Sequence, residues 1–145
     1  MLMEVERKRV RKYFLWEKYI REGIIEERQR LTVSRHSKNS LGYDDPTGGI
    51  VVRKNSYLRF CKFTLPNGKR IKLKWPEKWI EVIEQVYAMY GVQPIVGMVQ
   101  ERIRDRKSPD VIADFAGIGR NTYYRWEREF LEDAVLLAAK RGLLD

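Results

Sequence analysis

The segment from Arg120 to Arg128 carries side chains that could read the edges of DNA bases. Counted at about 100° per residue along a helix, one face would carry a polar and basic set: Arg120, Asn121, Tyr124, Arg125 and Arg128. Arginine pairs with guanine, and asparagine with adenine, through two hydrogen bonds each in the major groove. Thr122 and the free N-terminus of the helix could also hold a phosphate.

The opposite face of the same helix is apolar, and we expect it to pack in a core rather than to stack on bases. Its members are Tyr123, Trp126, Phe130, Ala134 and Leu137. The arginines could instead form an ordinary solvated face, paired with Glu127, Glu129 or Glu132. Both interpretations of the basic face are open at this point.

The residues before this helix have the order of a helix-turn-helix. Ser108 as N-cap and Pro109 in the first turn should begin a short helix. We expect its apolar face to contain Val111, Ile112, Phe115 and Ala116. A tight turn follows at Gly117-Ile118-Gly119, with Ile118 buried between the two helices. Such patterns also occur in proteins that do not bind DNA.

The end of the second helix, from Ala134 to Ala139, is apolar on every side. A helix of this kind has to be covered all round. The N-terminal helix could cover it, or a second copy of the chain could. We therefore predict a homodimer, which also suits a helix-turn-helix protein that binds two half-sites.

A second basic segment, from Tyr57 to Trp75, is predicted to be a β-hairpin with its turn at Pro66-Asn67-Gly68. Alternation along its second arm should turn Arg70, Lys72 and Lys74 outward, and Ile71, Leu73 and Trp75 inward. We predict contacts to backbone phosphates from the basic residues of this region, namely Arg53, Lys54, Lys69, Arg70, Lys72 and Lys74.

The remaining elements are predicted to be mostly helical. Apolar spacing predicts one long helix from Glu4 to about Gln29, a helix from Pro76 to Tyr90, and another from Pro94 to about Arg106. Ser34 to Gly49 should be a loop with a turn at Asp45-Pro46-Thr47-Gly48. The fold class is mainly α, a helical bundle with a C-terminal helix-turn-helix and one β-hairpin. The predicted parts are the long helix (1–30), a basic linker (31–56), the hairpin (57–75) and the helix-turn-helix domain (76–145).

Charge points to a polyanionic partner. The net charge is +9, and between Leu31 and Trp75 the basic residues are opposed only by Asp44 and Asp45. The alternative is that a basic surface only keeps the chain soluble, but that does not require such segregation.

Several classes of protein are disfavoured by the composition. One cysteine, Cys61, and one histidine, His36, argue against an internal disulfide and a zinc site. No phosphate-binding glycine loop or nucleophile motif is present, so we predict neither an enzyme nor a cofactor. The acids Asp105, Asp110 and Asp114 fit helix-end roles better than a nuclease metal site. No apolar run reaches the ~18 residues of a membrane span, and no signal peptide is recognisable, which favours the cytoplasm.

The chain resembles the ArpU/RinA-like regulators of phage and prophage late genes. The resemblance rests on the basic N-terminal helix, Asp45-Pro46-Thr47-Gly48, the Trp79–Glu84 helix, and the closing Ile118–Trp126 segment. It implies a small activator that binds a phage promoter and helps RNA polymerase begin late transcription, often of packaging genes. It also implies a C-terminal part similar to the promoter-reading region of sigma factors.

Two other functions compete with a sequence-specific regulator of double-stranded DNA. A small-terminase-type packaging subunit also pairs a helix-turn-helix with a basic surface, but it assembles into rings. A protein-interaction module would use the apolar C-terminal helix and would not bind DNA. The sequence leaves open the DNA target, the oligomeric state, and the choice between activation and repression.

Overall fold

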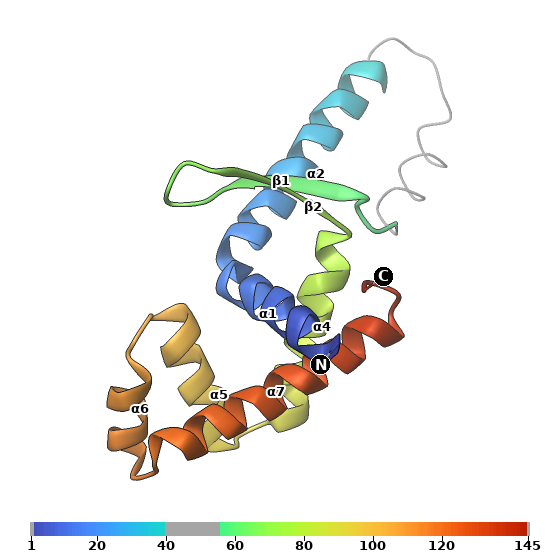
Figure 1. Ribbon diagram of the computed structural model, residues 1–145. Helices are drawn as coiled ribbons and strands as arrows, with labels where there is room; N and C mark the ends of the chain where they lie inside the picture. Colours follow the sequence, from blue (N-terminus) through green and yellow to red (C-terminus); the bar gives the residue numbers. More distant parts are fainter. Residues whose placement is uncertain (1, 40–55, 145) are drawn as a thin grey trace. The chain divides into compact units, whose positions relative to one another are not determined.

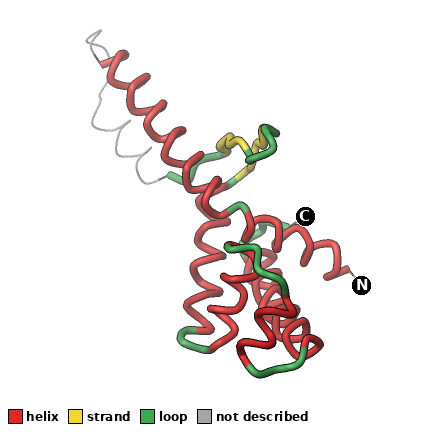
Figure 2. Tube along the Cα trace, turned by 90° about the vertical axis from the view of Figure 1, so that its left-hand side faces the viewer, coloured by secondary structure: helices red, strands yellow, loops and turns green. Residues whose placement is uncertain are grey.

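The computed structural model describes residues 2–39 and 56–144, with side chains at residues 4–32 and 56–144 (Figure 1). The described chain is mainly helical with one two-stranded antiparallel hairpin, as predicted (Figure 2). It divides into two compact units. The first comprises residues 1–17 and 79–145, and the second comprises residues 18–78.

The first unit is built around the packing of α1 (Leu2–Leu15) against α7 (Arg120–Lys140) (Figure 1). The Phe14 and Phe130 rings meet edge to face with centroids 5.5 Å apart. Most of α4 (Pro76–Tyr90) also belongs to this unit, and the Tyr13 and Trp79 ring centroids are 4.6 Å apart. As predicted, α4 begins at Pro76 and ends before Gly91, whose φ of +58° stops the helix.

The predicted long N-terminal helix is wrong at both its middle and its end. A turn at Trp16 separates α1 from α2 (Glu17–Asn39), and α2 continues through Ser34–Asn39, where a loop was expected. Polar residues suggested that loop, but no glycine or proline occurs from Ile24 to Leu41 to stop a helix. The predicted turn at Asp45-Pro46-Thr47-Gly48, and Arg53 and Lys54, lie outside the described residues.

The predicted helix from Pro94 to Arg106 is also only partly correct. After α5 (Pro94–Val99) the chain widens into a π-helical turn, η1 (Gln100–Arg104). The Asp105 amide donates to the Gln100 carbonyl at 3.2 Å, a bond that spans five residues instead of four. The spacing of apolar residues cannot distinguish an α-helical turn from a π-helical turn when only one turn is involved.

The apolar end of α7 is covered on one side only. Three residues of this segment are buried within the first unit: Ala134, Val135 and Ala138. Leu136, by contrast, is 60% exposed. Part of this segment is therefore covered within the first unit. That a second copy covers the rest stays a prediction.

The second unit consists of α2, β1 (Phe60–Thr64), β2 (Arg70–Lys74) and the residues around them. The strands pair from Phe60 with Lys74 to Thr64 with Arg70, which confirms the predicted hairpin. Cys61, Phe63 and Leu73 form its buried face. The prediction that Trp75 points inward is wrong, because β2 ends at Lys74 and Trp75 has a φ of +53°. The Trp75 side chain is 37% exposed, directly before α4 begins.

Candidate nucleic-acid interface

The helix-turn-helix geometry begins with a capped helix, α6 (Pro109–Ala116). The Ser108 hydroxyl accepts a hydrogen bond from the Asp110 amide at 3.2 Å, and Pro109 lies in the first turn, both as predicted. Gly117 ends α6 at a φ of +73°, which glycine adopts without steric cost. Gly119 then precedes α7 as an extended residue without a side-chain cap.

The buried face of α6 differs from the predicted one. Ile112 and Ala113 are buried, whereas Val111 is 58% exposed and Phe115 is 91% exposed. In the described chain α6 packs chiefly against α7 and η1, so only a narrow side of this short helix is covered. Ile118, expected to be buried, is half-buried; its amide donates to the Ala113 carbonyl at 3.0 Å.

Asn121, Arg125 and Arg128 form an exposed stripe along the N-terminal half of α7, which we call the α7 stripe. Their spacing of four and three residues places them on one side of the helix. Their side chains make no hydrogen bond, ion pair or ring contact within the described residues. Thr122 and Tyr124 lie beside the stripe and are half-buried.

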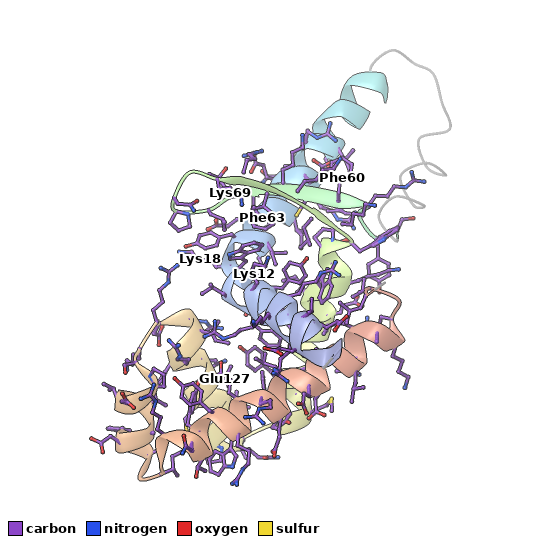
Figure 3. All side chains as sticks on the ribbon, in the orientation of Figure 1. Lys12, Lys18, Phe60, Phe63, Lys69 and Glu127 are labelled. Carbon is purple, nitrogen blue, oxygen red and sulfur yellow. The ribbon has the colours of Figure 1, made fainter. Side chains whose placement is uncertain are left out.

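Two of the three acids that could have neutralised the α7 stripe are paired with α1 instead. Arg11 Nε donates to Glu127 Oε1 at 3.1 Å, and Arg7 Nη1 lies 3.3 Å from Glu132 Oε1. Of the three acids in the solvated-face interpretation, two are therefore paired with arginines of α1. Figure 3 shows Glu127 on α7, within the helical part of the first unit.

Glu127 lies in a buried region that the sequence interpretation missed. It is only 6% exposed, and Tyr123, one turn earlier, is fully buried. Burial and the Glu127 carboxylate raise the pKa of Tyr123, against the opposing effect of Arg102 and Arg11. The 100° spacing places position 127 between Tyr123 and Leu131, so the same helical count could have revealed it.

Arg120 is placed differently from the stripe. Its Nε lies 3.4 Å from Asp110 Oδ1 on α6, and its guanidinium carbon lies 5.5 Å from the centroid of the Tyr124 ring. A hydrogen bond with Tyr124 and the nearby Asp110 carboxylate raise the pKa of Arg120. Arg120 and Tyr124 therefore interact with each other beside the α6–α7 turn.

A second basic surface lies on the hairpin of the other unit. Alternation turns four cations to its exposed side, and we call them the cationic hairpin face: Lys62, Arg70, Lys72 and Lys74. Lys69, also exposed, lies at the turn end of the hairpin, and Phe60 lies toward the other end (Figure 3). The sequence interpretation omitted Lys62, although alternation along the first arm would have found it.

Lys62 and Lys72 are direct cross-strand partners. Like charges in this position destabilise a hairpin. Two contacts reduce the repulsion: Lys72 Nζ lies 4.2 Å from the Phe60 ring centroid, and Glu27 on α2 is near Lys62. Arg30 chiefly, and Lys62 to a smaller extent, lower the pKa of Glu27. The hairpin nevertheless keeps its lysines exposed and has no acid of its own.

Comparison with known proteins gave no match to a family model, a curated protein or a solved structure. Among the described residues, no group of three or more His, Cys, Asp or Glu side chains could hold a metal ion. Within the same residues, no helix combines the length and apolar character that a membrane crossing needs.

Proposed function

We propose that this chain is a sequence-specific double-stranded DNA-binding protein that regulates transcription. The α7 stripe carries the proposal, because Asn121, Arg125 and Arg128 are exposed without partners while Glu127 and Glu132 are paired with α1. A duplex in contact with the stripe would supply both the missing acceptors and the missing negative charge. The N-terminal half of the second helix is where such motifs meet base edges in the major groove.

Phosphate contacts from the second unit would supply most of the sequence-independent affinity. Lys69 and the cationic hairpin face are exposed and suited to this role. Arg53 and Lys54 belong to the same proposal on sequence grounds. Phosphate contacts fix the register of a protein on DNA, and base contacts select the sequence.

The resemblance to ArpU/RinA-like regulators supports a narrower role. In that role the chain is encoded by a phage or prophage and acts in the bacterial cytoplasm as an activator of late, packaging or structural genes. It would act as a homodimer and could contact RNA polymerase. The partly uncovered end of α7, where Leu136 is exposed, is the surface we assign to dimerisation.

Selection from random duplexes at two salt concentrations tests the central proposal. We expect an enriched motif that wild-type protein binds more tightly than random DNA. Arg125→Ala should weaken binding to that motif by about 5- to 150-fold, because a good bidentate base contact contributes about 1–3 kcal/mol. Lys18→Ala removes the same charge from an exposed position on α2, outside the proposed contact surfaces, and serves as the control.

Equal losses on the motif and on random DNA would contradict base reading by Arg125. Absence of any duplex binding at low salt would contradict the proposal as a whole and favour the protein-interaction module. A mass measured by light scattering separates a dimer from the ring of a small-terminase-type packaging subunit.

A further inference from the structure

Trp75 combines a strained backbone with an exposed side chain. Its φ of +53° is unfavourable for a bulky residue, and its amide is held by the Arg59 carbonyl at 2.9 Å. The strain is not compensated by burial, since the indole remains 37% exposed. Strained residues that persist in a fold concentrate at functional sites.

The indole belongs to an aromatic cluster that surrounds a lysine. Lys78 Nζ lies 4.6 Å from the Trp75 ring centroid and 5.2 Å from that of Tyr57. Tyr57 is also exposed, and the next residue, Leu58, is fixed by its amide, which donates to Glu77 Oε1 at 2.9 Å. We call these three residues the aromatic–lysine cluster: Tyr57, Trp75 and Lys78.

The cluster begins at the end of β2 that carries Lys74 of the cationic hairpin face. Trp75 follows Lys74 in the chain, and Lys74 pairs across the strands with Phe60, whose ring lies under Lys72. One continuous stretch of the second unit therefore presents flat apolar rings beside positive charges. No acid occurs in the sequence from Pro46 to Pro76.

We infer that the second unit binds single-stranded nucleic acid, with an unpaired base stacked on Trp75 and the neighbouring phosphates on the cationic hairpin face. A positive surface that follows the backbone, combined with aromatic side chains that stack on bases, is how proteins hold single strands without sequence readout. A base within a duplex is already stacked on both faces and offers no free ring to the indole. This activity differs from duplex recognition by α7, and it uses residues of the other unit.

Fluorescence anisotropy of the full chain with labelled oligothymidylate and oligouridylate, each about 15 nucleotides long, tests the inference. Trp75→Ala should weaken binding about 5- to 150-fold, as expected for the loss of one stacked base. Trp75→Phe should retain most of the affinity because the phenyl ring still stacks. Phe115→Ala is the matched control, since it removes an exposed aromatic ring outside the cluster.

Intrinsic fluorescence gives an independent measurement that does not depend on the alanine variant folding. Stacking of a base should quench the indole emission of the wild type, and Trp75→Phe should abolish that quenching while it still binds. Arg125→Ala should leave both signals unchanged, which separates this activity from duplex recognition. A preference for one oligonucleotide over the other would identify DNA or RNA as the source of the strand.

Unaltered affinity in a folded Trp75→Ala protein, or quenching that persists in Trp75→Phe, would overturn the inference. A duplex of the same length that quenches the indole as strongly as the single strand would also overturn it. In the expected result, the duplex binds without quenching Trp75.

Discussion

At the scale of single residues, the pairing of Glu127 with Arg11 determines the chemistry of α7. The carboxylate is nearly buried, and its partner comes from α1 instead of the next turn of its own helix. This arrangement stabilises the contact between α1 and α7 and also withdraws the Glu127 carboxylate from Arg125 and Arg128. The surface charge of α7 therefore depends on how the acids of the same helix are buried.

Cys61 gives a residue-scale prediction about pH. Burial, reinforced by Glu27 and Glu77, raises the pKa of its thiol to about 12, against an ordinary value near 9. The folded protein keeps the proton that the unfolded chain loses, so this contribution to stability is complete below about pH 9 and is lost as the pH rises toward 12.

Alkylation measures the same property of Cys61. The native protein should react with iodoacetamide far more slowly at pH 8.5 than the urea-unfolded protein, because the thiolate is the nucleophile. Rapid modification of the folded protein at that pH would contradict the burial of this thiol.

At the scale of elements, α2 and β1 of the second unit approach each other closely at Gly23. A Cβ atom on Gly23 would lie 2.8 Å from the Lys62 carbonyl oxygen and 3.2 Å from Cys61 Sγ. The glycine therefore allows the helix to lie directly against the backbone of the strand that carries Lys62. A larger residue would have to move the hairpin away from α2.

Gly23→Ala should destabilise the protein by about 1–3 kcal/mol, as measured by the denaturant midpoint, because the obstacle is backbone. The control is Gly97→Ala in α5, where an added Cβ meets nothing within 4 Å. That change should be neutral or stabilising by up to about 1 kcal/mol, since alanine is the better helix former. Equal midpoints for the two variants would contradict the close packing of α2 on β1.

At the scale of the whole molecule, two exposed basic surfaces of different character contribute to the net charge of +9. The α7 stripe combines two arginines with an asparagine, as base reading requires. The cationic hairpin face is made mainly of lysines, which act as point charges toward phosphate. Mutations in the α7 stripe should therefore change the choice of DNA sequence. Mutations in the cationic hairpin face should change the general affinity for a polyanion.

Salt titration of random-duplex binding measures this separation. Each phosphate neutralised contributes a slope of about 0.9 to the dependence of log affinity on log salt concentration. The double change Lys62→Gln with Lys72→Gln should therefore reduce the slope by about 1.8. Lys18→Gln should leave the slope unchanged. An unchanged slope in the double variant would remove the hairpin from the phosphate contacts.

Elements with local signals were predictable from the sequence. Pro76, the Ser108-Pro109 pair, Asn67-Gly68 and Gly117 each mark a boundary through their own backbone preference, and the structure has boundaries there. The exposed sides of the α7 stripe and of β2 also followed from simple periodicity.

The features that could not be predicted depend on packing between distant segments. The turn at Trp16 has no glycine or proline, and the boundary between the two units follows it directly, after Glu17. The exposure of Phe115 depends on what packs against α6, and the outward turn of Trp75 depends on where β2 ends and α4 begins. Periodicity shows which residues could be buried, but not which of them receive a neighbour.

The contact between α1 and α7 also has a consequence during translation. Arg11 and Glu127 are separated by 116 positions, and Arg7 and Glu132 by 125. At about 5–20 residues per second, α1 leaves the ribosome on the order of ten seconds before its partner helix is made. During that interval Phe14 lacks the cover of Phe130 on α7, so a stalled or truncated nascent chain would present it to chaperones and proteases.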